Sequence, residues 1–349
     1  MLTSRGWILS TVVFAALSAT SHSQEAPKID AVPFLGDRYP VRHTAFANGV
    51  VGLPDVAYEY IPGFRPLTLD VYLPPDGAKK RHPLILYIHG GGWTTGHSRQ
   101  SGAFDDFPAV LASLAARGYT VASLNYRLSS EAPFPAAIQD VKAAIKFLRS
   151  RDAEYGVDLA KALVWGGSAG GHLAALAALT CGVEELEPTA ALDPSPEFVR
   201  VAAQSDCVQA AVTWYGVFDL AMMPSLNGAA GPSPTIKKFL GYQGDVGSAE
   251  LLDTASPRHY IKSDSPPFLL VHGSVDKTVD PAQSTRFKDA MERAGAHVDL
   301  VMIPSVDHSF IGTTPEATRE ASLLALHRTF EFIDATFKPR GNGTTTGHY

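Results

Sequence analysis

The chain has 349 residues, of which 45% are hydrophobic and 18% charged, with 30 Gly, 25 Pro and 2 Cys. These proportions exclude a disordered chain, a collagen and a disulfide scaffold, and they are typical of a globular protein with a large core. The formal net charge is -6, from 29 Lys and Arg against 35 Asp and Glu, and no basic cluster stands out, so we expect no nucleic acid partner.

The N-terminal residues differ from the rest of the chain. Residues 7–17 form a short apolar stretch, WILSTVVFAAL, followed by small polar residues. This pattern is typical of a secretory signal, with cleavage after Ser23 or after Ser21, and it is too short to span a bilayer. An uncleaved membrane anchor is the alternative interpretation. We expect a signal peptide over 1–23, a single domain over 24–337 with no later membrane span, and a secreted or periplasmic protein.

The central part of the chain alternates between strand and helix patterns. From residue 84 the strand candidates are continuous apolar runs, which is typical of parallel strands buried on both faces. The expected strands are 56–60, 67–73, 84–88, 120–126, 162–166, 208–216, 267–273 and 298–303. The expected helices are 135–151, 171–179, 281–294 and 315–337. This alternation predicts an α/β fold, with a mainly parallel central sheet and helices on both faces.

Two stretches, 182–206 and 221–257, break the alternation, and the second is rich in Gly, Pro and Ser. Insertions at the carboxyl edge of such a sheet commonly cover the site, so we expect a small cap-like insertion. The last residues, 338–349, are expected to be a disordered tail.

The two cysteines, Cys181 and Cys207, are 26 positions apart. In an oxidising compartment they would form a single disulfide. By restricting the unfolded chain, it would stabilise the folded protein by roughly 3.5 kcal/mol. Two free buried thiols are the alternative. Neither cysteine is placed like a nucleophile or a metal ligand.

Residues 166–170, GGSAG, fit the motif G-x-S-x-G directly after an expected strand and before a helical stretch. A strand that turns sharply into a helix at a serine needs small flanking residues. The turn exposes the hydroxyl at the helix N-terminus, where negative charge is favoured. The motif therefore predicts that Ser168 is a nucleophile, with a purely structural glycine-rich turn as the alternative.

Residues 89–93, HGGGW, directly follow another expected strand. Ester hydrolysis generates a tetrahedral oxyanion that backbone N–H groups stabilise, and glycines let that backbone approach closely. The motif predicts an oxyanion hole. A glycine loop that merely connects a strand to a helix is the alternative.

A nucleophilic serine needs a base and a group that orients the base, and the order Ser, acid, His places the base late in the chain. Beyond the last expected strand by a loop or more lie His308, in the loop directly after it, and His327, in the middle of a helix. We therefore predict His308 as the base. For the acid we favour Asp276, in the turn after a strand, over Asp280, interpreted as a helix N-cap, and Asp307, next to the base.

Together these segments resemble the α/β-hydrolase esterases related to hormone-sensitive lipase. The resemblance rests on HGGGW, NYRL at 125–128, FPAAIQDVKAAIKFL at 134–148, GGSAGGHLA at 166–174, and the HGSVDKTV and DHSF segments. Within that group the chain looks most like the secreted carboxylesterases that include acetyl-xylan and feruloyl esterases, with kynurenine formamidases as cousins. The similarity covers about positions 56–335.

The resemblance implies a Ser168, Asp276 and His308 triad. It also implies that the N–H groups of Gly91, Gly92 and Ala169 are the oxyanion donors, with Gly90 as a possible substitute. The chain departs from the hormone-sensitive-lipase pattern at Gly167, where Asp is usual, and at Ser274, where the acid turn often reads HGD. Both departures bear on the subfamily and leave the triad intact.

The expected function is that of a secreted serine carboxylesterase acting on short-acyl or hydroxycinnamoyl esters, small or linked to polysaccharide. Aromatic residues beside the predicted site are candidates for its pocket wall: Trp93, Tyr126, Trp214 and Tyr215. No spacing matches a zinc, calcium or phosphate site, so we expect no metal and no cofactor. The alternatives are an amide hydrolase, such as a formamidase or exopeptidase, with the same triad, and a non-catalytic binding protein on a hydrolase scaffold.

Overall fold

The computed structural model describes residues 42–61, 63–188, 196–223, 233–242 and 249–338. The expected signal peptide and all of the expected tail except Lys338 lie outside these ranges. In the part that is described, no helix combines the length and the apolar character needed to cross a membrane.

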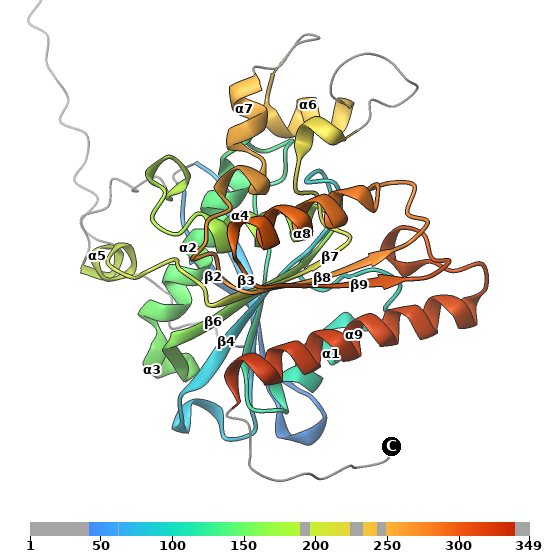
Figure 1. Ribbon diagram of the computed structural model, residues 1–349. Coiled ribbons are helices and arrows are strands. Elements are labelled where there is room, and N and C mark those ends of the chain that lie inside the picture. Colours follow the sequence, from blue (N-terminus) through green and yellow to red (C-terminus); the bar gives the residue numbers. More distant parts are fainter. Residues whose placement is uncertain (1–41, 62, 189–195, 224–232, 243–248, 339–349) are drawn as a thin grey trace, which may run out of the picture. The chain divides into compact units, whose positions relative to one another are not determined.

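The described strands form one nine-stranded sheet (Figure 1). The first three neighbour pairs in the sheet are antiparallel, and every pair from β5 onward is parallel. In sheet order the strands are β1 (Thr44–Ala45), β2 (Val51–Glu59), β3 (Leu67–Leu73), β5 (Thr120–Leu124), β4 (His82–Ile88), β6 (Val157–Gly167), β7 (Ala210–Trp214), β8 (Phe268–Gly273) and β9 (Val298–Ile303). This confirms the predicted mainly parallel sheet.

Helices cover both faces of the sheet (Figure 1). One face carries α1 (Phe107–Ala115) and α9 (Pro315–Phe337), and the other carries α2 (Ala136–Ser150), α4 (Ala169–Leu179) and α8 (Ala282–Ala294). Each face therefore has its own apolar core, as expected for parallel strands that are buried on both sides.

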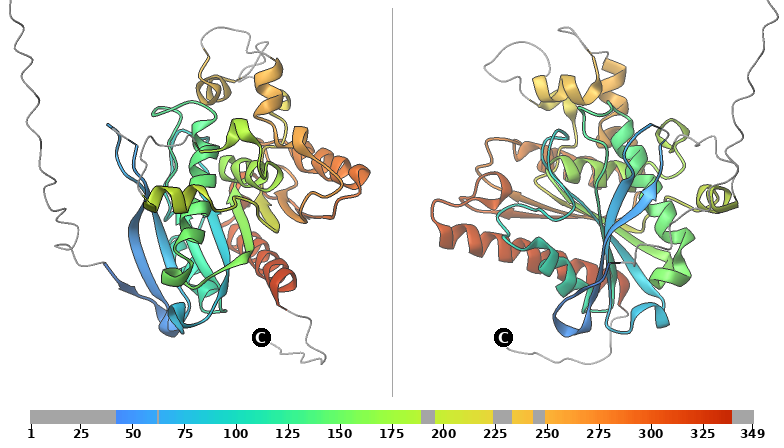
Figure 2. Two further views of the ribbon diagram at one scale, coloured as in Figure 1. Left: turned by 90° about the vertical axis from the view of Figure 1, so that its left-hand side faces the viewer. Right: turned by 180° about the vertical axis from the view of Figure 1, so that it is seen from behind.

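Shorter helices connect these elements. They are α3 (Asp152–Tyr155), α5 (Pro196–Ala202), α6 (Pro234–Leu240), α7 (Ala249–Thr254) and the 3-10 helices Ala47–Gly49, Gly77–Lys79, Glu184–Leu186, Leu220–Met222, Pro257–Tyr260 and His308–Phe310. Figures 1 and 2 show α6 and α7 together, projecting beyond the helical layer that contains α4. The insertion 221–257 supplies both helices.

The path of the chain brings two glycine-rich loops together. From β4 the chain runs through α1 to β5 on one side, and from β5 through α2 to β6 on the other side of β4. The loops that follow β4 and β6 therefore leave adjacent strands at the point where the strand order reverses. In open α/β sheets this is the place where ligands bind.

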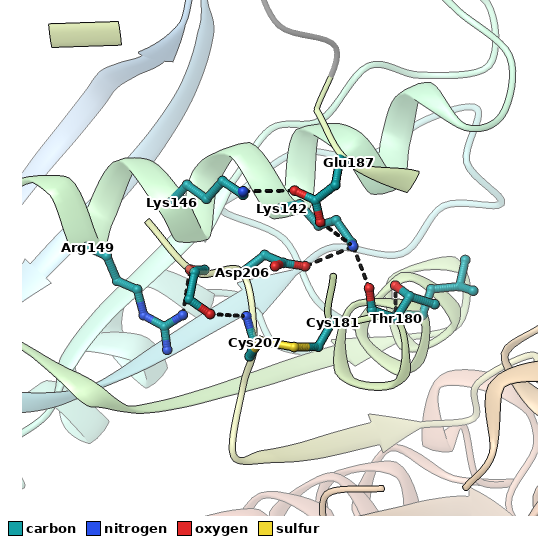
Figure 3. The surroundings of a disulfide bond; sticks show 10 residues. Lys142, Lys146, Arg149, Thr180, Cys181, Glu187, Asp206 and Cys207 are labelled. Atoms are coloured by element: carbon teal, nitrogen blue, oxygen red, sulfur yellow. Dashed lines mark hydrogen bonds and ion pairs between the residues drawn. A yellow bond between two sulfur atoms is a disulfide. The ribbon is translucent and has the colours of Figure 1, made fainter. Parts of the chain in front are cut away.

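The insertion 182–206 is tied to α2 near a disulfide (Figure 3). Cys181 and Cys207 are bonded, with a Cα–Cα distance of 4.7 Å, so the predicted pairing is present. Next to it the buried ammonium of Lys142, on α2, lies 2.8 Å from the carboxylate of Asp206 and 3.1 Å from that of Glu187. Removing either carboxylate would leave a buried charge short of a partner.

Candidate active site

Ser168 lies in the sharp turn between β6 and α4. Its backbone is in a rare conformation for a non-glycine residue, with φ 55° and ψ -121°. The turn depends on close packing, because a Cβ at Gly166 would overlap the carbonyl of Gly170, and one at Gly170 would overlap the carbonyl of Ile88 on β4. The spacing of the GGSAG glycines is thus the steric condition for presenting the hydroxyl at the carboxyl edge of the sheet.

The structure brings the three predicted triad residues together. His308 Nε2 lies 3.0 Å from Ser168 Oγ, and His308 Nδ1 lies 2.8 Å from Asp276 Oδ2. Asp276 follows β8 and His308 follows β9, so both reach the same sheet edge as Ser168. The arrangement fits a serine hydroxyl that donates to Nε2 of a neutral imidazole whose Nδ1–H donates to the carboxylate.

Hydrogen-bond donors surround the Asp276 carboxylate. Oδ1 accepts from the backbone N–H groups of Thr278 and Val279, at 2.8 and 2.9 Å, and Oδ2 lies near ring nitrogens of His308 and His272. Burial alone would raise the pKa of Asp276, but the hydrogen bonds from His272 and His308 outweigh it and hold the pKa well below the usual range. The carboxylate is therefore ionised at neutral pH and can stabilise a positive charge on His308.

The residues considered as alternatives have other partners. Asp280 accepts a hydrogen bond from the first N–H of α8, and His327 is exposed on α9, where it faces Glu331. Asp307 accepts from the backbone N–H groups of His308 and of Lys277, so it orders the loop that carries His308.

Gly91, Gly92 and Ala169 line the same cavity as Ser168, and so does Gly90. Gly91 and Gly92 have φ values of 106° and 60°, and Ala169 is the first residue of α4. Within the described ranges the N–H groups of Gly91, Gly92 and Ala169 have no hydrogen-bond acceptor. They are therefore available to a ligand oxygen beside Ser168.

The cavity has a volume of about 600 Å³. Trp93 and Tyr215 line it, as predicted, and one wall comes from the insertion 221–257 through Met223, Ser233, Thr235 and Ile236. The other insertion, 182–206, supplies none of its lining residues in the described part of the chain. The expectation that such insertions cover the site therefore holds for one of the two, because the other packs against α2.

The placement of Tyr126 and Trp214 in the cavity wall is wrong. The Tyr126 ring stacks on His89 with centroids 4.3 Å apart, and its hydroxyl donates to the His89 carbonyl, so it packs behind the glycine loop. The Trp214 indole points into the core on the α9 side and donates to Thr329 Oγ1 at 2.9 Å. Both lie at strand ends, where the direction of the side chain decides which residues reach the cavity.

The two correctly placed aromatic residues have different surroundings. Trp93 donates to His172 Nδ1 at 3.2 Å and stacks on Phe239 of α6 at 4.5 Å, which links the glycine loop to the insertion. The Tyr215 ring lies 4.7 Å from that of His308. A Cβ at Gly167 would lie 3.1 Å from the Tyr215 ring, so the tyrosine occupies space that the usual Asp would need.

Sequence reasoning missed two residues that support the site. Phe239 lies in the Gly-, Pro- and Ser-rich insertion, where no periodic pattern marks it. His272 immediately precedes Gly273 in the HGSVD segment, and a histidine four residues before the predicted acid was the available signal.

Known proteins match both the sequence and the fold. The chain is 35% identical to esterase LipQ of Mycobacterium tuberculosis over 273 residues, which are 78% of this chain and 59% of LipQ. A truncated carbohydrate esterase from gut microbiota superposes with a TM-score of 0.68 at 25% identity, covering 84% of this chain and 99% of that one. The esterase Est2 of Thermogutta terrifontis gives a TM-score of 0.64 at 26% identity, covering 82% and 94%.

The chain spans between half and two thirds of the length of the first curated relatives that it matches. The BD-FAE family profile matches residues 69–291, a segment that contains both glycine loops, Ser168 and Asp276. With this match, the nine-stranded sheet and the esterase neighbours, the chain has the α/β-hydrolase fold and belongs to the BD-FAE family.

Proposed function

We propose that this chain is a serine carboxylesterase that acts on short-acyl or hydroxycinnamoyl esters through an acyl-enzyme on Ser168. The observation that carries the proposal is the hydrogen-bonded series Asp276, His308, Ser168, which opens into a cavity with free backbone N–H groups. Relatives named as esterases, among them LipQ, support ester hydrolysis.

In the acylation half, the Ser168 oxygen forms a bond to the ester carbonyl carbon while its proton passes to His308 Nε2. The carbonyl oxygen becomes an oxyanion, which the N–H groups of Gly91, Gly92 and Ala169 stabilise. The ionised Asp276 stabilises the imidazolium of His308. The tetrahedral intermediate then breaks its bond to the alcohol oxygen, which leaves with the proton from Nε2.

In the deacylation half, water takes the place of the alcohol. His308 Nε2 accepts a proton from the water as its oxygen attacks the acyl carbon. The second tetrahedral intermediate releases the Ser168 oxygen, which regains the proton from the imidazolium. The free acid leaves and the resting hydrogen bonds are restored.

Three observations favour short-acyl esters and esters carried on polysaccharide. A neighbour in structure is a carbohydrate esterase, another is a bifunctional GH43-CE protein of Bacteroides eggerthii, and Est2 has been solved with propionate bound. The N-terminal apolar stretch and the Cys181–Cys207 disulfide support a secreted or periplasmic location for the enzyme.

The test is hydrolysis of p-nitrophenyl acetate, butyrate and octanoate by the mature protein, with Ser168→Ala as the matched variant. We expect turnover of acetate and butyrate by the wild type and a loss of at least about 10³-fold in Ser168→Ala, because the nucleophile is removed. Hydrolysis of methyl ferulate and of acetylated xylan then tests hydroxycinnamoyl esters and acetyl esters carried on polysaccharide. p-Nitroacetanilide is the matched amide, and faster cleavage of it than of p-nitrophenyl acetate would identify an amide hydrolase. Equal inertness of wild type and variant would refute the proposal.

A further inference from the structure

His272 lies one residue before the end of β8, and its side chain is fully buried. Nε2 is 3.2 Å from Asp276 Oδ2 and 3.0 Å from the Val279 carbonyl oxygen, and Nδ1 is 2.7 Å from Ser284 Oγ in the first turn of α8. Every polar atom of this ring therefore has a partner. One partner is the carboxylate oxygen that also faces His308.

The partners of His272 place a proton on its Nε2. A carboxylate oxygen and a carbonyl oxygen both accept hydrogen bonds, so Nε2 must carry the proton. The Ser284 hydroxyl lies 2.7 Å from Nδ1 and can serve it as a donor or as an acceptor. The single N–H at Nε2 is therefore shared between Asp276 Oδ2, at 3.2 Å, and the Val279 carbonyl oxygen, at 3.0 Å, and His272 is not a second base in the site.

We infer that His272 is a positioning residue for the catalytic pair, and that it sets the strength with which Asp276 holds the proton on His308. This inference rests on the proposed serine hydrolase function. Oδ2 receives two donors, one from each histidine. The donor from His272 draws negative charge away from Oδ2 and fixes the carboxylate plane, so His308 faces a weaker and more precisely placed acceptor.

If His272 only stabilised the loop after β8, its N–H would not need to face Asp276 Oδ2. The loop after β8 is already closed by Asp276 Oδ1, which accepts from the N–H groups of Thr278 and Val279. The additional donor falls on the other oxygen, the one that contacts the base. Other ionisable groups near His308 are Asp307 and Lys277 in the neighbouring loops and Tyr215 at the end of β7, and none of them changes in the variants below.

The experiment compares His272→Phe, His272→Gln and His327→Gln in the full chain. Phe keeps a ring of similar volume without a donor, Gln can present an N–H near the position of Nε2, and His327 is a matched histidine exposed on α9. Titration with paraoxon, which phosphorylates Est2, counts the competent Ser168 in each preparation. All rates are then expressed per competent serine, which removes the contribution of misfolded protein.

For His272→Phe we expect kcat on p-nitrophenyl acetate to fall roughly 10- to 100-fold with little change in KM. The acidic limb of the kcat/KM profile should move to higher pH by roughly half a unit, because Oδ2 regains charge and holds the His308 proton more tightly. His272→Gln should recover most of kcat and the wild-type limb, and His327→Gln should match the wild type. The inference would be overturned if His272→Phe kept both the wild-type kcat per competent serine and the acidic limb of the kcat/KM profile at its wild-type pH.

A second readout separates this inference from the proposed function. The Nδ1 proton that His308 shares with Asp276 gives a downfield proton NMR signal that does not depend on turnover. If the wild type hydrolyses no ester and takes up no paraoxon, the proposed function fails, and the NMR signal still decides the role of His272. It must shift in His272→Phe and stay in place in His327→Gln. An unmoved signal in His272→Phe means that the ring only fills space.

Discussion

Gly170 determines how closely the nucleophile turn packs against β4. A Cβ at this position would overlap the carbonyl oxygen of Ile88, which belongs to β4, a strand paired with β5 on one side and β6 on the other. We expect Gly170→Ala to lower the free energy of unfolding by roughly 3 kcal/mol. It should also reduce kcat, because a shift of α4 displaces the N–H of Ala169. Urea unfolding and ester hydrolysis per competent serine measure the two effects.

Gly118→Ala is the matched control for this substitution. Its Cβ would meet no atom within 4 Å, but its φ of 94° still disfavours a side chain. We expect Gly118→Ala to lower the free energy of unfolding by roughly 1 kcal/mol and to leave kcat unchanged. Gly170 itself lies in α4 without a positive φ, so equal losses in the two variants would contradict the explanation by the contact with β4.

At the scale of single residues, the sequence predicts which residues lie at the edge of the sheet better than it predicts where their side chains point. Ser168, Asp276 and His308 could be predicted because each follows a strand, and the carboxyl ends of parallel strands share one edge of the sheet. Tyr126 and Trp214 also follow or end strands but point into the two cores. Their direction depends on the local pleat and on partners such as Thr329, which lies 115 residues from Trp214.

The parallel strands were predictable because burial on both faces makes them continuously apolar, and the long helices because burial of one face imposes a period. Five apolar residues of α2 at spacings of three and four are fully buried: Ile138, Val141, Ala144, Ile145 and Leu148. The seven-residue α6 could not be predicted, since it lies in a Gly-, Pro- and Ser-rich insertion. Its position follows from a tertiary contact, the stacking of Phe239 on Trp93, and no local pattern encodes that contact.

Phe239 fixes α6 over the cavity. Its ring lies 4.5 Å from that of Trp93, 5.4 Å from that of His172 and 5.6 Å from that of Phe134. We expect Phe239→Ala to loosen the wall formed by Thr235 and Ile236 and to cost about 1 kcal/mol of substrate binding, or roughly fivefold in KM for p-nitrophenyl butyrate. The triad lies outside this contact, so kcat should change less than KM.

Lys238→Ala, an exposed change on the same helix, controls for the helix itself and should leave KM at the wild-type value. Michaelis–Menten kinetics on butyrate and octanoate provide the comparison. A fall in kcat at constant KM in Phe239→Ala would show that α6 acts on the chemistry and not on binding.

The whole molecule should lose stability in mild acid because two histidines are buried in the neutral form. Burial lowers the pKa of both His89 and His172 to about 4, although hydrogen bonds to backbone carbonyls oppose the shift. Their pKa in the unfolded chain is about 6.5. Unfolding therefore takes up protons below that pH, and the stabilisation is fully present above it and lost as pH falls towards the folded value. Each histidine should lower the free energy of unfolding by about 3 kcal/mol between pH 7 and pH 4.

Urea unfolding over this pH range measures the effect. His172→Gln keeps a donor and an acceptor but does not titrate, so its unfolding free energy should depend less steeply on pH than that of the wild type. His297→Gln, at an exposed position, should follow the wild-type curve. Parallel curves for His172→Gln and the wild type would contradict the assignment.

One wall of the cavity and the hydrogen-bonded triad are built from separate parts of the chain. Ser168, Asp276 and His308 follow strands of the sheet, whereas Met223, Thr235 and Ile236 come from one insertion. In the described residues no hydrogen bond joins these three wall residues to the triad. Mutation in the insertion can therefore change which acyl group fits without altering the distances over which protons move. A change of substrate range by mutation therefore requires no redesign of the reaction, and libraries aimed at a new ester should be confined to that wall.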